Sequence, residues 1–258
     1  MRALKNNSKI QLNNSRLTEF CHTPREAYQK IRAANNRLAI PPDLSILING
    51  IACPDTESET QSKKRANISR TDIFLIEISS VRRLTLHGYE LQLNFVRDYF
   101  VNQYGLEEWF AELCDKSRGM PNGTKTRHTP KTKGINVPPH VIQWAALIEM
   151  SIEPDEAIST TIANIVNYIK KPIIFVGHFD VRKPDGQRVV DRVRLNKCIK
   201  SSAETNGAGY FEPSSLIGLA GADLALRDNN HWADDFLEIA GRHILENHIT
   251  PKLREGFR

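Results

Sequence analysis

The stretch Asp72-Ile-Phe-Leu-Ile-Glu-Ile-Ser-Ser80 decides the fold class. It is rich in β-branched and aromatic residues and predicts a central parallel strand. A second apolar run, Ile173-Ile-Phe-Val-Gly177, predicts another buried strand. Helical patterns lie between and around the two runs, and strands that alternate with helices form a parallel sheet. The sequence therefore predicts an α/β fold.

Helix signals are spread over the whole chain. Thr23-Pro-Arg-Glu26 has the N-cap, the first-turn proline and the capping-box glutamate of a helix start. Apolar residues at helical spacing predict further helices over 91–104, 106–115, 140–149, 154–168, 189–204 and 232–247. Short strands are predicted over 44–48, before the turn Asn49-Gly50, and over 209–211.

The composition is that of a globular protein. The chain has 258 residues, of which 40% are hydrophobic and 25% charged, so disordered and fibrous classes are excluded. No apolar run approaches the roughly 20 residues of a membrane span. The first 14 residues are polar and basic, without the apolar stretch of a secretory signal. We therefore expect a cytoplasmic protein.

The cysteines give no sign of a metal site or a disulfide framework. Cys21, Cys53, Cys114 and Cys198 are separated by 32, 61 and 84 residues, without a C-x-x-C pair or a histidine cluster beside them. Structural zinc sites and disulfide-rich domains have much closer spacings. No metal is predicted.

A basic loop is predicted over 116–139. The net charge is +5, and the part from Lys116 to Lys133 holds six Lys or Arg and no Asp or Glu. We expect these charges to be uncompensated and the loop to act as a lid, since loops of this length are usually functional. A single basic loop favours an anionic small substrate and argues against nucleic acid, which needs a basic face.

The clearest chemical motif is Asp228-x-x-His231, directly before the last predicted helix. An aspartate and a histidine on one turn allow the carboxylate to hold one ring nitrogen, which leaves the other as a general base. The competing interpretation is an N-cap aspartate beside a histidine that faces solvent.

The motif has a context that resembles a known family. The segments 173–177, 194–196 and 209–214, followed by Asp228-x-x-His231 and a final helix, resemble the end of the SGNH/GDSL hydrolase superfamily. The resemblance implies a three-layer α/β/α sandwich with a central parallel sheet, flavodoxin-like, in one domain over 1–258. In that family a nucleophilic serine comes first, then a glycine after the second strand, an asparagine after the third, and Asp-x-x-His last.

The family's first block corresponds to Asn13-Asn14-Ser15-Arg16. The resemblance implies that Ser15 is the nucleophile and that Arg16 binds substrate. Asn13 and Asn14 replace the family's Gly-Asp, and a serine in an N-terminal loop is the competing interpretation.

The oxyanion groups are less well matched. Gly50 corresponds to the family's second block, although it is equally typical of a turn. Ser79 and Ser80 stand where the family has Gly-x-Asn-Asp, so that their hydroxyls or amides would replace the asparagine. They are also typical of a strand end, and either one is an alternative nucleophile. His178 follows the strand 173–177, at the edge where open α/β folds bind ligands.

The resemblance implies a serine esterase or an O-acyltransferase that acts on a carbohydrate-linked or other small ester. No cofactor is expected, apart from acyl-CoA as co-substrate of a transferase. The alternative is a non-catalytic module that binds an anionic glycan or nucleotide-sugar through the basic loop. The sequence leaves the oligomeric state open.

Overall fold

The structure is a computed structural model that describes residues 21–50, 69–116, 120–131, 136–180, 190–228 and 231–256. Its contacts divide the chain into two compact units. Among the described residues, unit 1 comprises 69–79 and 159–256, and unit 2 comprises 21–50 and 80–158. Within the described ranges, no helix has the length and apolar character needed to cross a membrane.

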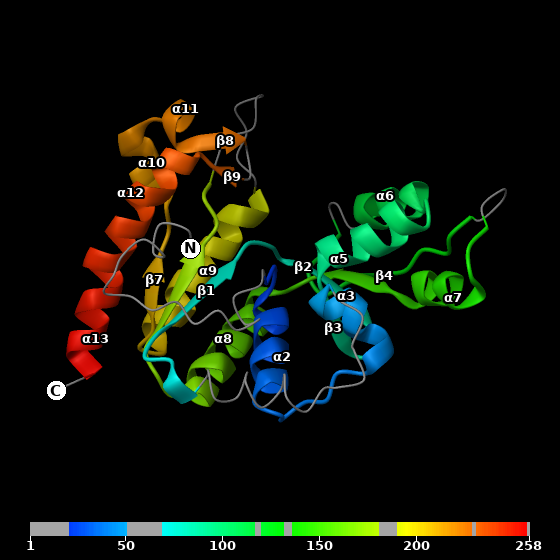
Figure 1. Ribbon diagram of the computed structural model, residues 1–258, viewed down its shortest axis with the longest axis horizontal. Helices are drawn as coiled ribbons and strands as arrows, with labels where there is room; N and C mark the ends of the chain where they lie inside the picture. The colour runs from blue at the N-terminus through cyan, green and yellow to red at the C-terminus, as the bar shows by residue number, and fades with distance from the viewer. Residues whose placement is uncertain are drawn as a thin grey trace. The chain divides into compact units, whose positions relative to one another are not determined.

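Unit 1 contains a parallel sheet (Figure 1). Its strand order is β1 (Phe74–Ile78), β6 (Ile173–Gly177), β7 (Gly209–Phe211), and both pairs are parallel. The predicted α/β class, with a parallel sheet, is confirmed, as are these three strands. Among the described strands, β6 rather than β1 has a neighbour on each side.

Helices pack on this sheet through its apolar side chains. Ile174, Val176 and Phe211 form one buried cluster with Ile244 and Ile249 of the C-terminal helices. The described helices of unit 1 are α8 (Asp155–Ile169, which begins in unit 2), α9 (Val190–Thr205), α10 (Ser214–Ala220), α11 (Ala222–Ala225), α12 (Asp234–Ile244), the π-helical η4 (Leu245–Ile249) and α13 (Thr250–Gly256). A two-stranded ribbon, β8 (Leu226–Asp228) and β9 (His231–Trp232), precedes α12.

Unit 2 is built on an antiparallel sheet that the sequence analysis did not predict. The strand order is β3 (Tyr89–Leu91), β2 (Arg82–Leu86), β5 (Glu149–Ile152), β4 (Lys125–Thr126). His87 and Gly88 both have positive φ, 51° and 84°, as the two-residue turn between β2 and β3 requires. The fold is therefore mixed, with parallel and antiparallel sheets.

The helices of unit 2 enclose its core. They are α2 (Pro24–Ala34), η2 (Pro42–Leu44), α3 (Ser45–Asn49), α5 (Leu93–Arg97), the π-helical η3 (Asp98–Gln103), α6 (Glu107–Lys116) and α7 (Pro139–Leu147). The predicted start of α2 is confirmed, because the Thr23 hydroxyl accepts a hydrogen bond of 3.2 Å from the Glu26 backbone N–H.

The predicted strand over 44–48 is wrong, because this segment is helical in η2 and α3. Leu44, Leu47 and Ile48 are at most 2% exposed, and their i, i+3, i+4 spacing places all three on one face of a helix. Gly50 ends α3 with φ of 72°, a left-handed cap.

The basic loop differs from the expectation in two ways. Lys125–Thr126 is a strand, β4, which pairs with β5. The expected uncompensated charge is also wrong where it is described: Lys125 and Arg127 both pair with Glu149, and Lys131 pairs with Glu112. The acids come from other elements, so the local charge count did not include them.

Candidate active site

The carboxyl ends of the parallel strands in unit 1 bring polar residues to one edge of the sheet. Ile78 pairs with Gly177, and Val176 pairs with Phe211, so the three strands end almost level. The next residues along the chain are Ser79, His178 and Glu212. This edge is where open α/β sheets bind ligands.

Hydrogen bonds join the segments that follow β6 and β7. The backbone N–H of Asp180 donates to the Ser214 hydroxyl oxygen at 2.8 Å. The Ser214 backbone N–H donates to the Glu212 carboxylate at 2.9 Å, and its hydroxyl donates to the same carboxylate oxygen. The Glu212 carboxylate thereby fixes the direction of the Ser214 hydroxyl, which in turn holds the backbone after His178.

Asp228 and His231 are in direct contact, as the motif predicts for an acid-base pair. Both carboxylate oxygens lie within hydrogen-bond distance of His231 Nδ1, at 2.9 and 2.8 Å, and the His231 backbone N–H donates to Asp228 at 2.8 Å. The side chains are 60% exposed for His231 and 50% for Asp228. With Nδ1 bonded to the carboxylate, Nε2 is the nitrogen that can accept a proton from a hydroxyl.

An aromatic contact connects this pair to the sheet edge. Phe179, which follows His178, is buried and lies 6.4 Å from the Trp232 ring, centroid to centroid. Trp232 follows His231 and also packs edge-on against Phe236 of α12. These aromatic rings belong to one apolar cluster, so the β8–β9 ribbon is seated on the chain directly after β6.

Arg192 of α9 adds a cation beside the same segment. Its guanidinium lies 5.8 Å from the centre of the Phe179 ring, a cation–π contact. Burial lowers the pKa of Arg192, and the charge of Asp180 opposes that change. The side chain remains a cation, as arginine does in proteins.

Behind the edge, Gly177 allows two polar side chains to approach the backbone closely. A β-carbon at Gly177 would lie 2.6 Å from the Tyr210 phenol oxygen and 2.7 Å from Asn196 Oδ1. The Asn196 amide donates to the His178 carbonyl at 2.5 Å. Within the described residues, Asn196 Oδ1 and the Tyr210 hydroxyl are buried without a hydrogen-bond partner. Burial, and secondarily the charges of Glu212 and Glu204, raises the pKa of Tyr210, so its phenol stays protonated.

The predicted oxyanion residues have local structural roles. A β-carbon at Gly50 would lie 2.6 Å from the Phe95 ring, and the positive φ also favours glycine there. The Ser80 hydroxyl accepts a hydrogen bond of 2.9 Å from the Arg82 backbone N–H, and the Ser80 N–H donates to the His22 carbonyl at 2.8 Å. Gly50 and Ser80 belong to unit 2, whereas Ser79 belongs to unit 1. Their catalytic roles stay predictions.

Ser15 and Arg16 lie outside the described residues, so the nucleophile also stays a prediction. The structure brings Asp228 and His231 into contact. It places His178 directly before Phe179, whose ring packs on Trp232 in the ribbon that carries the pair. Sequence reasoning missed Asp180, Arg192, Glu212 and Ser214 as site residues. The signal for three of them was their position, one to three residues beyond a correctly predicted strand.

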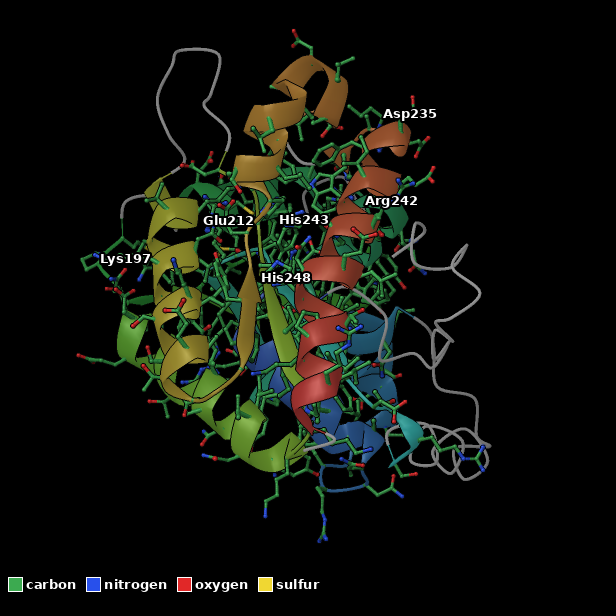
Figure 2. All side chains as sticks on the ribbon, turned by 90° about the vertical axis from the view of Figure 1, so that its left-hand side faces the viewer. Lys197, Glu212, Asp235, Arg242, His243 and His248 are labelled. Carbon is green, nitrogen blue, oxygen red and sulfur yellow. The ribbon has the colours of Figure 1, made fainter. Side chains whose placement is uncertain are left out.

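A second group of histidines lies over β7 (Figure 2). The His243 and His248 rings are 5.8 Å apart, and each lies within 5.6 Å of the Phe211 ring. Burial, followed by the neighbouring His243, lowers the pKa of His248. This group is a packing contact between β7 and the C-terminal helices.

Comparison with known proteins finds a matching family and a distant relative. The sequence profile of the TviD N-terminal domain matches residues 1–247. The chain is 24% identical over 235 residues to the Vi polysaccharide biosynthesis protein TviD of Salmonella typhi. The alignment covers 88% of this chain and 27% of that protein, so the chain spans about a quarter of its relative. No solved structure matches.

Proposed function

The chain belongs to the TviD N-terminal domain family, and from that premise we propose that it transfers or hydrolyses the acyl group of a carbohydrate-linked ester. The relative's name places that protein in polysaccharide biosynthesis. The site supplies an acid-base pair of the kind that acyl transfer uses. An ester on a sugar hydroxyl is therefore the substrate of the proposed hydrolysis or the product of the proposed transfer.

The contact between Asp228 and His231 carries this proposal. Two carboxylate oxygens within 2.9 Å of Nδ1 keep the proton on that nitrogen and leave Nε2 as the base. A structural N-cap aspartate needs only a backbone N–H, whereas Asp228 also holds the imidazole ring. The high exposure of both side chains leaves room for a glycan to approach them.

In the proposed mechanism, Ser15 is the nucleophile. Its oxygen attacks the ester carbonyl carbon while His231 Nε2 takes the hydroxyl proton. His231 then returns the proton to the leaving alcohol as the old C–O bond breaks, and Asp228 stabilises the imidazolium. Water or a sugar hydroxyl then attacks the acyl carbon and gives its proton to His231 Nε2. The bond between the Ser15 oxygen and the acyl carbon breaks, and His231 returns the proton to Ser15. Where a sugar is the acceptor, acyl-CoA is the proposed donor, and its thiol is then the leaving group.

The same proposal includes an SGNH-type three-layer fold over 1–258. The Ser79 or Ser80 hydroxyl would supply an oxyanion donor, because the Gly50 and Ser80 backbone N–H groups already donate to the Ile46 and His22 carbonyls. His178 with Arg16 would contact the substrate. The parallel sheet and the Asp-His pair beyond its last strand support this assignment. It requires Ser15 to reach His231, which covalent labelling tests directly.

The experiment uses a fluorophosphonate probe and two acyl donors, p-nitrophenyl acetate and acetyl-CoA with an oligosaccharide acceptor. We expect labelling of the unmodified protein, its loss in Ser15→Ala, and a fall of two or more orders of magnitude in turnover in His231→Ala. His140→Ala is the matched control, because His140 is an exposed histidine outside the sheet edge. Labelling that moves to Ser79 or Ser80 would reassign the nucleophile. A folded protein without labelling or turnover would instead indicate the non-catalytic module.

A further inference from the structure

The sheet of unit 2 separates its side chains into an apolar face and a polar face. Residues two apart on a strand share a face, and so do residues directly opposite each other on antiparallel strands. Leu84 pairs with Met150, and both belong to the buried core together with Leu86 and Leu91. The residues between them in sequence therefore face the other way.

On this second face, strand register aligns charged residues from three strands. Arg83 of β2 and Lys125 of β4 both pair with Ser151 of β5, one on each side. Thr85 pairs with Glu149 one step further along the same face. The alignment is a consequence of backbone pairing and does not depend on the flexibility of the side chains.

The charged residues of this face and Thr85 line a pocket with a volume of about 270 Å³. It opens between β2, β4 and β5, and the tight turn after β2 forms part of its wall. Its lining consists of Arg83, Thr85, His87, Gly88, Lys125, Arg127, Leu147 and Glu149, all from unit 2.

Positive charge exceeds negative charge in this lining. Glu149 accepts hydrogen bonds from Lys125 Nζ at 3.0 Å and from Arg127 Nη2 at 2.7 Å, so one carboxylate holds two cations. Those hydrogen bonds lower the pKa of Glu149, chiefly through Lys125, and keep it ionised. Arg83 is the third cation, and its Nε and Nη2 donate to Glu90 at 2.6 to 3.0 Å. Three cations therefore face two carboxylates even when Glu90 is counted with the residues that line the pocket.

Two of the three cations, Lys125 and Arg127, are held in place and are also accessible. Lys125 and Arg127 are 59% and 55% exposed, whereas the Glu149 side chain that holds them is 21% exposed. A carboxylate below two exposed cations orients them before a ligand arrives, which reduces the entropy lost on binding.

We propose that this pocket binds the oxyanion, carboxylate or phosphate, of a charged sugar. Arg83, Lys125 and Arg127 would contact the anion. The Glu149 carboxylate would accept hydrogen bonds from neighbouring sugar hydroxyls, and the Thr85 hydroxyl would accept or donate them. The choice of a sugar rests on the proposed function, but the anion site rests on unit 2 alone. All residues that line the pocket belong to unit 2, whereas Asp228 and His231 belong to unit 1.

Titration calorimetry tests the proposal by measuring how tightly the full chain binds four probes. Trigalacturonate carries carboxylates, UDP-glucose and inorganic phosphate carry phosphate, and maltotriose is the neutral control. For each anionic probe that the unmodified protein binds, we expect the double variant Lys125→Gln/Arg127→Gln to bind at least tenfold more weakly. The affinity of the variant should also depend less on salt concentration. Lys131→Gln is the matched control, because Lys131 lies in the same loop but pairs with Glu112 outside the pocket.

The outcomes distinguish the sources of the anion. Binding of trigalacturonate alone identifies a carboxylated sugar, and binding of UDP-glucose or phosphate identifies a phosphate. Equal binding of maltotriose, equal weakening by Lys131→Gln, or no binding of any probe overturns the proposal. Circular dichroism and a melting curve establish that the double variant is folded. Titrating His231→Ala in parallel separates this site from the proposed reaction, since that variant should bind the probe normally.

Discussion

The carboxylate of Glu26 accepts a hydrogen bond of 3.0 Å from the backbone N–H of His22, and the Glu26 side chain is almost completely buried in unit 2. Burial raises the pKa of Glu26 to about 8, against the smaller opposing effects of this hydrogen bond and of Lys30. Burial also raises the pKa of Glu153, which is 2% exposed and pairs with Arg25. Unit 2 therefore folds around carboxyl groups that hold their protons more tightly than in the unfolded chain.

This difference predicts a loss of stability as the pH rises from about 4.5 to about 8. The unfolded Glu26 ionises near its ordinary value of 4.5, whereas the folded side chain keeps its proton up to about pH 8. The free energy of unfolding should therefore fall as the pH rises between these values. Glu26→Gln, which is always neutral, should show a smaller fall between pH 5 and 8. Thermal unfolding of both proteins across this pH range measures the fall in stability. Glu156→Gln is the control, because Glu156 is exposed. An unchanged slope in Glu26→Gln would refute the raised pKa.

His248 gives unit 1 a pH dependence of the opposite sign. Because its pKa is lowered in the folded state, the folded protein binds fewer protons than the unfolded chain below about pH 6.5. Stability should therefore decrease as the pH falls through this region. His248→Gln should lessen the decrease, and His140→Gln should not. Melting curves at pH 7 and 5 compare the variants, and an identical pH response in both would count against the packing described for His248.

A methyl group at Gly177 should destabilise the end of β6. Gly177→Ala places a β-carbon within 2.7 Å of both the Tyr210 oxygen and Asn196 Oδ1, so one of them must move. We expect a cost of about 1–3 kcal/mol. Tyr210→Phe removes one of the two clashing atoms and should restore part of the loss in the double variant. Denaturant unfolding measures the coupling, and strictly additive effects would mean that the backbone moves instead.

Trp232 should act as a positioning residue for the Asp-His pair. Trp232→Ala removes the ring that packs on Phe179 and Phe236, which we expect to destabilise unit 1 by on the order of 2 kcal/mol. Turnover should fall further than the folded fraction alone explains, and Trp232→Phe should recover much of it. The ratio of kcat to the folded fraction, measured for both variants, tests this. A fall in kcat that merely follows the folded fraction would leave the tryptophan with a structural role.

Sequence reasoning succeeded where the determining residues are close together in the chain. β1, β6 and β7 are short runs bounded by turn residues, and the contact between Asp228 and His231 spans only three positions. It failed over 44–48, because a short apolar run fits a buried strand and a buried helix equally well. A Pro-Pro start and the i, i+3, i+4 leucine and isoleucine spacing were the signals for the helix.

The antiparallel sheet was missed although its alternation is visible in Arg82-Arg-Leu-Thr-Leu-His-Gly-Tyr-Glu-Leu91. The pairing of Lys125 and Arg127 with Glu149 was harder to foresee, since it joins residues more than 20 positions apart. Such contacts depend on which strands pair and in which register, and local patterns do not determine that. The predicted charge surplus of the loop was wrong for the same reason.

Because the unit 2 sheet has an apolar face and a polar face, residues on the polar face can be replaced without repacking the core. Leu84, Leu86 and Met150 are committed to the core, whereas Arg83, Lys125 and Arg127 are separated from it by the backbone itself. Replacements at Lys125 and Arg127 leave the core volume untouched, whereas replacing Arg83 would leave the buried Glu90 carboxylate without its cation. The same alternation penalises a strand slipped by one residue, since that shift would turn the cations inward and the leucines to water. The residues at positions 125 and 127 can thus change without a change in strand pairing.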